Sequence, residues 1–451
     1  MTTISQAEQY PPSGAAARVV VAGAGFGGLA AVRRLAGTGV QTTLIDRNVY
    51  TTFQPLLYQV ATGGLAGSDV AYPLRAFTRQ YGAAFRHGEL AGIDPSARRI
   101  RLADGAEFGY DYLILATGAA TAYHGIPGAA EHTLSLYTLH DAIALRDHIM
   151  ATLDRVTLSG LHDQLTVTVI GGGATGVELA GTLADLRTIA LPAYFPEIDP
   201  ARVHVTLIDR SPALLMPFHQ RLRDYARRQL VGRGVEIRLG TTIAEVIPGK
   251  VVLADSTALT SDITVWAAGV AAPHAAGDWG LPQASSGRIL VGPDLRVSGQ
   301  DRIFAVGDVA LIEDQPLPQV AQPAIQMGRY AGAQIIRAMN GDPPGAAFRY
   351  HDKGIMATIG RRSAVVQLAQ GPRFRGTLAW LAWLGLHLIT LLGGRNRMSA
   401  LLNLSYRYLV WGHGGGVIVG DDPPAMAPGG TPEQVPAAAT VPQRPSRPRA
   451  R

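Results

Sequence analysis

Short runs of β-branched and apolar residues recur along the chain and predict buried strands of parallel sheets. Two of these runs, at 18–22 and 165–170, are each followed by a glycine cluster and a stretch that predicts a helix. Two further runs, at 41–46 and 203–209, each end in an aspartate. The remaining runs lie at 111–118, 261–269 and 302–308. Because the order of features occurs twice, the pattern predicts an α/β fold with an internal duplication.

The two glycine clusters share one spacing. They read GAGFGG at 23–28 and GGGATG at 171–176, and each lies between a predicted strand and a predicted helix. Glycines in this position let the backbone turn sharply and approach a pyrophosphate, whose charge meets free N–H groups at the helix N-terminus. The alternative is two glycine-rich turns in an ordinary α/β sheet. The repeated context favours two Rossmann-like dinucleotide-binding domains, and therefore two nucleotide cofactors.

An acid follows each glycine cluster at the end of the next strand. Asp46 lies at the usual distance, whereas Asp209 lies farther on, beyond an insertion that contains Pro192, Pro196 and Pro200. A carboxylate in this position can accept hydrogen bonds from both ribose hydroxyls of an adenine nucleotide.

The amino-acid composition excludes several classes of function and binding site. The chain of 451 residues has no cysteine, which excludes thiol catalysis, disulfides and cysteine-ligated metals. The net charge is +6, but no basic stripe interleaved with aromatic residues predicts nucleic-acid binding. The histidines, such as His124, His132 and His140, lack the spacing of a zinc site, so no metal is expected. The N-terminus does not resemble a signal peptide, and we therefore expect a cytoplasmic protein.

An apolar segment at 378–392 contains only His387 and Thr390 as polar residues. A helix of this length would extend about 22 Å, less than the roughly 30 Å hydrocarbon core, so it should not span a bilayer. Arginines flank the segment, and Trp380 and Trp383 lie within it. It is typical of an interfacial helix in the headgroup region. A core or dimer-interface helix is the alternative interpretation.

Taken together, these residues resemble the type II NADH dehydrogenases, which are single-chain NADH:quinone oxidoreductases among the flavoprotein reductases with two dinucleotide-binding domains. The resemblance runs from about residue 18 to 411. Its most specific motifs are FQPLLYQVATG at 53–63, GVELAG at 176–181, AQPAIQ at 321–326 and YHDKGIMATIG at 350–360, followed by RNR at 395–397.

The resemblance implies that the first domain holds FAD without a covalent bond. Asp46 would bind the adenosine ribose, Asp308 would lie toward the ribityl chain and phosphates, and the main chain of Leu90, after a strand at 84–89, would contact adenine. Asp308 could instead simply cap a helix. The full expected FAD set is Gly23, Gly25, Phe26, Gly27, Gly28, Asp46, Arg47, Leu90, Ala116, Thr117, Gly118, Gly307, Asp308, Ala321 and Gln322.

For NADH, the resemblance implies a site on the second glycine cluster. Asp209 would bind the ribose hydroxyls and would repel the 2′-phosphate of NADPH. The family commonly has Glu where this chain has Asp209. Glu178 would position or protonate groups near the nicotinamide and flavin rings, or it could only complement the helix dipole. The full expected NADH set is Gly171, Gly173, Ala174, Thr175, Gly176, Glu178, Asp209, Ala268 and Gly269.

The quinone site implied by the resemblance contains Gln322 and Gln326, which are four residues apart and so share one helix face. Their amides could hydrogen-bond quinone carbonyls. Lys353 would stabilise the anionic reduced flavin, unless it is only a surface lysine. The expected catalytic residues are therefore Glu178, Gln322, Gln326 and Lys353.

The expected function is a non-proton-pumping respiratory NADH:quinone oxidoreductase, peripheral on the cytoplasmic face of the membrane. It would contact the membrane through residues about 376–410 and use menaquinone or ubiquinone. A homodimer is one of the oligomeric states that the resemblance allows. Sulfide:quinone oxidoreductases and disulfide reductases need cysteines that this chain lacks. Another electron acceptor, or a non-catalytic NAD(H)-sensing flavoprotein, stays open as an alternative.

The expected domain organisation follows the two glycine clusters. It comprises a flexible N-terminus at 1–15, an FAD-binding domain at 16–120 and 290–345, an NADH-binding domain at 121–289, a C-terminal quinone and membrane region at 346–415, and a disordered Pro/Ala-rich tail at 416–451.

Overall fold

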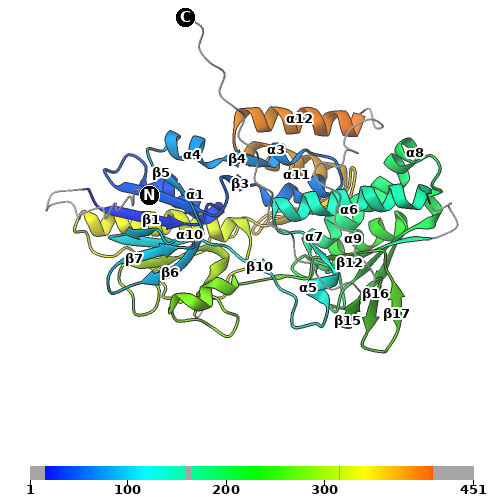
Figure 1. Cartoon of the computed structure of the whole chain (residues 1–451). Coiled ribbons are helices and arrows are strands. Elements are labelled where there is room, and N and C mark those ends of the chain that lie inside the picture. The colour runs from blue at the N-terminus through cyan, green and yellow to red at the C-terminus, as the bar shows by residue number, and fades with distance from the viewer. Residues whose placement is uncertain (1–15, 159–163, 314, 410–451) are drawn as a thin grey trace, which may run out of the picture.

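The computed structural model describes residues 16–158, 164–313 and 315–409. The predictions for the N-terminal segment 1–15 and the tail 416–451 lie outside these residues. Two five-stranded parallel sheets form the two halves of the molecule, which lie side by side (Figure 1).

The first sheet has the strand order β21-β9-β1-β2-β5. Its central strand, β1 (Arg18–Ala22), pairs in parallel with β2 (Gln41–Asp46) and with β9 (Tyr112–Leu115). The outer strands are β5 (Ala84–His87) and β21 (Ile303–Ala305), so a strand from late in the chain completes the sheet. The apolar side chains of β1 and β9 are buried in one core, as expected for strands covered on both faces.

The second sheet repeats this arrangement with the order β11-β18-β12-β13-β14. Strand β12 (Leu165–Ile170) is central between β13 (Val203–Ile208) and β18 (Ile263–Trp266), with β14 (Val235–Arg238) and β11 (Leu134–Ser135) at the edges. A three-stranded antiparallel sheet accompanies each half, formed by β6 (Leu90–Asp94), β7 (Arg99–Leu102) and β8 (Glu107–Gly109), and by β15 (Ile243–Ile247), β16 (Lys250–Leu253) and β17 (Ala258–Thr260). The predicted α/β duplication is therefore confirmed.

Helices cover the sheets, and one helix in each half begins at the glycine cluster of that half. In the first half, α1 (Phe26–Leu35) packs against α10 (Ala321–Met339), with Gly27 and Gly328 at the contact. In the second half, α7 (Ala174–Asp185) follows β12, and α6 (Leu139–Leu158) and α9 (Gln220–Gly232) lie nearby (Figure 1). The proline-containing insertion after α7 folds as η2 (Leu186–Ala190), α8 (Leu191–Tyr194) and η3 (Pro200–Arg202).

Several short elements lie outside the two large sheets. Strand β10 (Ala120–Thr121) pairs with β19 (Val270–Ala271), β3 (Tyr50–Thr52) pairs with β4 (Ala71–Pro73), and β20 (Ile289–Val291) pairs with β22 (Ala310–Ile312). The remaining elements are η1 (Gln54–Leu56), α2 (Leu57–Ala61), α3 (Gly67–Val70), α4 (Leu74–Gln80), α5 (Ala129–His132), η4 (His274–Trp279) and η5 (Gly307–Val309).

The C-terminal region is an antiparallel sheet of β23 (Ile355–Thr358), β24 (Ala364–Gln367) and β25 (Arg373–Arg375), followed by α11 (Thr377–Thr390) and α12 (Gly394–Leu409). Both helices lie at the top of the molecule in Figure 1, above the junction of the two halves. Helix α12 is held by the buried carboxylate of Asp69, which accepts hydrogen bonds from Ser399 and Asn403 at 2.6 and 2.8 Å. None of the helices in the described part of the chain has the length and hydrophobicity to cross a bilayer.

Two local expectations were wrong. The strand expected at 84–89 ends at His87, and Leu90 is instead the buried first residue of β6. The helix expected in the headgroup region buries Trp380 and Trp383 against the protein, because the hydrophobic core below α11 provides more apolar contact than the surface. The side of α11 that faces away from the protein exposes Leu378, Leu381, Leu386 and Ile389 instead.

Candidate functional site

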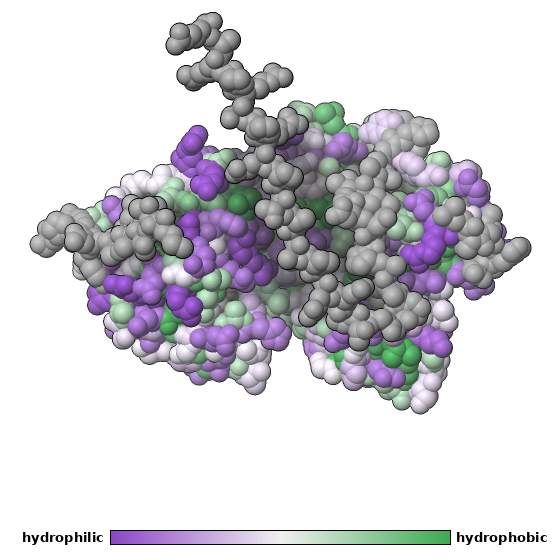
Figure 2. Space-filling model, viewed as in Figure 1, coloured by the Kyte–Doolittle hydropathy of each residue, from purple (hydrophilic) through white to green (hydrophobic). Residues whose placement is uncertain are grey.

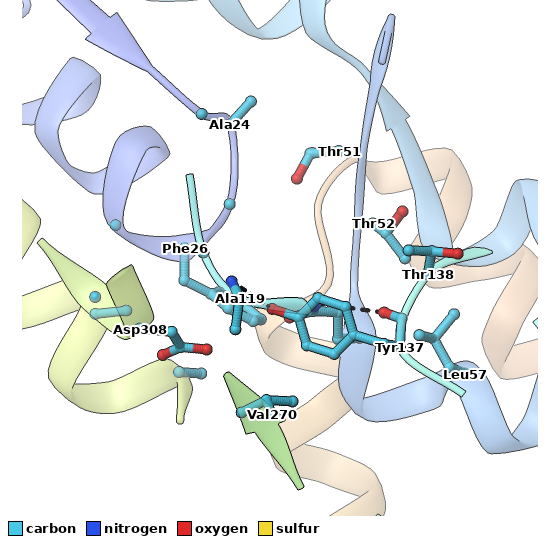
Figure 3. A pocket seen from close by; sticks show the side chains of 18 of the residues that line it. Ala24, Phe26, Thr51, Thr52, Leu57, Ala119, Tyr137, Thr138, Val270 and Asp308 are labelled. Atoms are coloured by element: carbon cyan, nitrogen blue, oxygen red, sulfur yellow. Dashed lines mark hydrogen bonds between the residues drawn. The ribbon is translucent and has the colours of Figure 1, made fainter. Parts of the chain in front are cut away.

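A cavity of about 580 Å³ lies at the junction of the two halves. It is lined by the glycine cluster after β1, by the loops after β2 and β9, and by the first turn of α7 from the other half. Figure 3 shows the ring of Tyr137 in the middle of this lining, between Asp308 and Val270 on one side and Leu57 and Thr138 on the other. The cavity lies at the carboxyl ends of parallel strands, which is where open α/β sheets bind ligands.

The first glycine cluster allows backbone approaches that no side chain would permit. Gly23 has φ +104°, and a Cβ atom there would lie 2.2 Å from the carbonyl oxygen of Ala116. At Gly28, a Cβ atom would lie 1.8 Å from the carbonyl oxygen of Gly23. A Cβ atom at Gly25 would meet no atom within 4 Å, so the face of Gly25 stays open to the cavity. The loop is thus closed on the protein side and open where a pyrophosphate would lie.

Asp46 is tied to this loop and also lines the cavity. Its Oδ2 accepts the N–H of Ala24 at 2.6 Å, and its Oδ1 accepts the N–H of Asn48 at 2.7 Å. Burial raises the pKa of the carboxyl group, while both hydrogen bonds act in the opposite direction. Each carboxylate oxygen has a further lone pair available for a ribose hydroxyl.

The second glycine cluster has the same local structure. Gly171 has φ +119°, and a Cβ atom at Gly176 would lie 1.8 Å from the carbonyl oxygen of Gly171, as in the first cluster. Asp209 accepts the N–H of Gly172 with Oδ2 and the N–H of Ser211 with Oδ1 at 2.5 Å. The duplication therefore extends to the hydrogen bonds of the two ribose-binding candidates.

Polar groups deeper in the cavity suit the middle of an FAD molecule. The Thr117 hydroxyl is buried and has no hydrogen-bond partner among the described residues, although it belongs to the lining. Burial also raises the pKa of Asp308, an effect that the nearby Arg288 opposes. A ribityl chain with several hydroxyls would satisfy both groups. We conclude that the residues present fit FAD.

Glu178 brings a carboxyl group from the second half to the same cavity. It is only 8% exposed, and its Oε1 accepts the backbone N–H of Thr358 at 3.1 Å. Burial raises the pKa of Glu178 to about 8, and hydrogen bonds from Thr358 and the Trp383 side chain act against this shift. The group is therefore mostly protonated at neutral pH and can donate a hydrogen bond into the cavity.

One face of α7 fixes Glu178 against the C-terminal sheet. A Cβ atom at Gly181 would lie 2.6 Å from the carbonyl carbon and oxygen of Ile359, so only glycine permits this approach. One turn later, Asp185 accepts the N–H of Arg361 at 2.6 Å. Glu178, Gly181 and Asp185 thus form one continuous seam with the segment 358–361.

Comparisons with known proteins agree with this geometry. Residues 17–328 match the family model described as pyridine nucleotide-disulphide oxidoreductase. A type II NADH:quinone oxidoreductase, Ndh of Mycobacterium tuberculosis, is 37% identical over 413 residues, covering 87% of this chain and 88% of that protein. The type II NADH:quinone oxidoreductase of Staphylococcus aureus is 30% identical over 361 residues, covering 77% of this chain and 89% of that protein.

The chain belongs to the type II NADH:quinone oxidoreductase family. Its fold also matches that of NDH2 from Plasmodium falciparum in complex with NADH, with a TM-score of 0.81 at 19% identity, over 90% of this chain and 100% of that one. The sulfide:quinone oxidoreductase of Aquifex aeolicus shares the fold with a TM-score of 0.71 at 20% identity, over 88% of this chain and 96% of that one. The lack of any cysteine distinguishes this member of the family from cysteine-dependent reductases.

For this type II oxidoreductase, the cavity brings together most of the FAD residues expected from the sequence. Those in the lining are Gly23, Gly25, Phe26, Gly27, Asp46, Arg47, Ala116, Thr117, Gly118, Gly307, Asp308 and Ala321, and the lining also contains Thr175 and Glu178 from the NADH set. Gly28, Leu90 and Gln322 do not belong to this lining. The adenine contact assigned to the main chain of Leu90 stays a prediction.

The expected quinone residues of the oxidoreductase lie outside the cavity lining. Gln326 donates from Nε2 to the carbonyl oxygen of His351 and accepts the His351 N–H with Oε1, both at 2.9 Å. Its amide therefore fixes the loop before β23. Gln322 is half-buried on α10, and Lys353 is exposed on that loop. Their roles toward quinone stay predictions.

Several polar residues in the lining were not predicted as site residues from the sequence, among them Gln54, Tyr58, Tyr137 and Gln319. Gln54 and Tyr58 fall within the motif at 53–63, so the motif itself was the available signal. Tyr137 accepts the N–H of Ala119 at 3.1 Å, and Gln319 donates to the carbonyl oxygen of Asp308 at 3.1 Å. No pattern around these last two residues indicated a site. Among the described residues, no group of His, Asp and Glu is arranged to hold a metal ion.

Proposed function

We propose that the protein oxidises NADH and reduces a membrane quinone without pumping protons. The observation that carries this proposal is the shared cavity, where the first glycine cluster with Asp46 and the start of α7 with Glu178 line one space. When bound there, FAD supplies the redox chemistry, taking up a hydride from NADH and passing two electrons to the quinone.

In this proposal the first half binds FAD. Gly23, Gly25 and Gly28 bring backbone N–H groups and the N-terminus of α1 to the pyrophosphate. Asp46 accepts the adenosine ribose hydroxyls, and Thr117 and Asp308 bind along the ribityl chain. These residues would hold the cofactor in the cavity that Glu178 also lines.

The second half binds NADH in the same manner. Gly173 and Gly176 open α7 toward the pyrophosphate, and Asp209 accepts the ribose hydroxyls. A carboxylate at this position repels a 2′-phosphate, so we expect NADH to be preferred over NADPH. Thr175 and Glu178, in the first turns of α7, line the cavity and would contact the nicotinamide and flavin rings.

We further propose that Gln322, Gln326 and Lys353 act in quinone reduction. The two glutamines share one face of α10, whose first residue, Ala321, lines the cavity. The Oε1 and Nε2 atoms of Gln326 are bonded to His351, which holds the amide in one orientation while each end keeps capacity for a further hydrogen bond. Lys353 would supply a positive charge near the reduced ring.

The apolar surface of α11 and α12 is the proposed membrane contact, on the cytoplasmic face. Ile389 is 71% exposed and Leu378 is 67% exposed, and Met398, Leu401 and Leu402 extend the surface onto α12. Figure 2 shows hydrophobic residues at the upper edge of the molecule, where α12 lies. Exposed arginines at 373, 375, 395 and 397 flank α11 and would meet anionic headgroups.

The test of the redox function is an anaerobic titration of the flavin absorbance of the purified holoprotein. Addition of NADH should bleach the absorbance, an equal concentration of NADPH should do so much more slowly, and a soluble quinone should restore it. Bleaching without recovery for every quinone tested would favour another acceptor or the NAD(H)-sensing alternative. No bleaching by NADH would contradict the proposal.

The membrane contact is tested by sedimentation with anionic phospholipid vesicles. Ile389→Glu should weaken vesicle binding, because it places a charge in the apolar surface, yet leave the reduction of a soluble quinone unchanged. Val231→Glu is the matched control, since Val231 is 53% exposed on α9, away from this surface. Equal vesicle binding by both variants would contradict the contact. Analytical ultracentrifugation of the purified protein would distinguish a monomer from the homodimer that the resemblance allows.

A further inference from the structure

The side chain of Tyr137 lines the cavity, although its backbone belongs to the loop between β11 and α6 of the second half. Hydrogen bonds fix this residue at three places. Its N–H donates to Oδ2 of Asp141 at 3.0 Å, and its carbonyl oxygen accepts from Nε2 of Gln54 at 3.4 Å. Its phenol oxygen accepts the N–H of Ala119 at 3.1 Å. The protein therefore sets the position of the phenol group without help from a ligand.

The phenol oxygen lies against the turn that follows β9. Gly118 in this turn has φ +73°, and a Cβ atom there would lie 3.4 Å from the phenol oxygen of Tyr137. Gly118 lines the cavity, and so does Asp308 on η5. Figure 3 shows the hydroxyl end of Tyr137 on the side of the cavity where Ala119 and Asp308 lie. The phenol group is therefore beside the residues that the proposed function places along the ribityl chain of FAD.

The phenol group of Tyr137 has a proton to donate and no protein acceptor for it. Within the described part of the chain, the phenol accepts from Ala119 but donates to no residue. Burial raises the pKa of Tyr137, and the nearby carboxyl group of Asp308 acts in the same direction. The group therefore keeps its proton near neutral pH. A donor that is left over in a partly buried site is satisfied when a ligand supplies the acceptor.

We propose that Tyr137 is an FAD-binding residue, which donates its phenol O–H to an oxygen of the ribityl chain. A ribityl hydroxyl both accepts and donates, so it can accept from Tyr137 while it donates to Asp308. Because Tyr137 follows β11 of the second sheet, this contact would hold the cofactor from the NADH-binding half as well as from the half that contains the first glycine cluster.

Dilution of the holoprotein, followed by the rise in flavin fluorescence, measures the Kd for FAD. Tyr137→Phe keeps the ring and removes the donor, so the Kd should rise about 3- to 10-fold. The loss of the acceptor for Ala119 affects the protein with and without FAD alike, so it does not contribute to this rise. Tyr110→Phe is the matched control, because the Tyr110 hydroxyl is buried in the core of the first half without a hydrogen-bond partner among the described residues. An unchanged Kd in Tyr137→Phe, or an equal rise in the control, would overturn the proposal.

Displacement of FAD by ADP locates the contact along the cofactor. ADP has the adenosine and the two phosphates of FAD but lacks the ribityl chain and the flavin ring. We expect Tyr137→Phe to leave the Kd for ADP unchanged. Asp46→Ala should raise the Kd for both ligands, because the proposed function places Asp46 at the adenosine ribose. If Tyr137→Phe weakens the binding of ADP as much as that of FAD, the phenol does not bind the ribityl chain and the proposal is wrong.

A second measurement keeps the phenol group and so covers the case in which Tyr137→Phe does not fold. With 3-fluorotyrosine placed at position 137 of the full chain, the ¹⁹F resonance should differ between the protein that holds FAD and the protein that holds ADP. The same label at position 110 should give one resonance in both states, because Tyr110 lies outside the cavity lining. A label at position 137 that does not respond to the exchange would show that the phenol does not contact the cofactor.

The contact rests on the proposed function for the place of FAD in the cavity, and the two can fail separately. If Tyr137→Phe weakens FAD binding in a holoprotein that reduces no quinone, the proposed function is wrong and the contact stands. If the holoprotein oxidises NADH and reduces quinone while Tyr137→Phe binds FAD as tightly as the unchanged protein, only the contact is wrong.

Discussion

Replacing Gly181 by alanine perturbs the seam that holds Glu178 at the cavity. Gly181 lies within α7, and its Cβ atom would be 2.6 Å from both the carbonyl carbon and the carbonyl oxygen of Ile359. Backbone atoms cannot rotate away as a flexible side chain can. The helix and the segment 358–361 must therefore separate to accommodate the methyl group.

The size of the effect can be estimated from three contributions. Alanine is favoured over glycine within a helix by about 1 kcal/mol. Overpacking against a fixed backbone costs about 1–3 kcal/mol. Separation also weakens the hydrogen bonds of Glu178 with Thr358 at 3.1 Å and of Asp185 with Arg361 at 2.6 Å, which contribute about 1–3 kcal/mol together. We expect Gly181→Ala to lower the free energy of unfolding by about 1–5 kcal/mol.

The assay is thermal unfolding of the holoprotein, followed by circular dichroism and by release of flavin fluorescence. For a chain of 451 residues the expected decrease in Tm is about 1 °C for each kcal/mol, or about 1–5 °C. Gly385→Ala is the matched control, because Gly385 lies within α11 and has no atom within 4 Å of a Cβ position. This control should be as stable as the unchanged protein or slightly more stable. If Gly181→Ala behaves like the control, the close approach does not fix α7 and the seam does not hold Glu178 in place.

Three further predictions concern the site. Asp209→Ala should raise the KM for NADH and reduce the preference for NADH over NADPH, as measured in steady-state assays with both donors. Unchanged discrimination between the two donors would contradict the role of Asp209 as the selector. Gln326→Ala should slow quinone reduction while anaerobic flavin reduction by NADH stays near normal in stopped-flow experiments, and equal loss in both steps would contradict the assignment. The pKa of Glu178 rises from 4.5 to about 8 on folding, so the native state binds a proton that the unfolded state releases. The stability from this group should therefore decrease as pH rises from 4.5 to about 8, and this part of the pH dependence of Tm should be absent in Glu178→Gln.

Local patterns in the sequence determined the parallel strands and glycine turns with good accuracy. The strands at 18–22, 41–46 and 165–170 have the boundaries that the apolar runs predict. The reason is that a strand buried on both faces must be apolar at successive positions, and that a tight turn below a pyrophosphate excludes side chains. Both constraints act on residues that are close in the sequence, so both are visible there.

Other features were decided by contacts between distant parts of the chain. The sequence shows that Trp380 and Trp383 lie in an apolar helix, but not that both face the protein. That orientation depends on β23 and β24, which cover one side of α11. The environment of Glu178 likewise depends on Thr358, 180 residues away, and on Trp383.

The cavity likewise contains residues that local sequence patterns could locate and residues that only tertiary contacts bring there. Asp46 and Asp209 could be located because each follows a glycine cluster at the end of a strand, and the structure gives both acids equivalent hydrogen bonds. Tyr137 and Gln319 could not be located in this way, because neither follows a glycine cluster at the end of a strand, and tertiary packing brings their segments to the cavity. The sequence by itself thus determined the fold class and the nucleotide-binding turns, which depend on local backbone geometry. Only the tertiary structure decided which side of α11 is exposed and how Glu178 keeps its proton, since burial and donors there come from segments far apart in the chain.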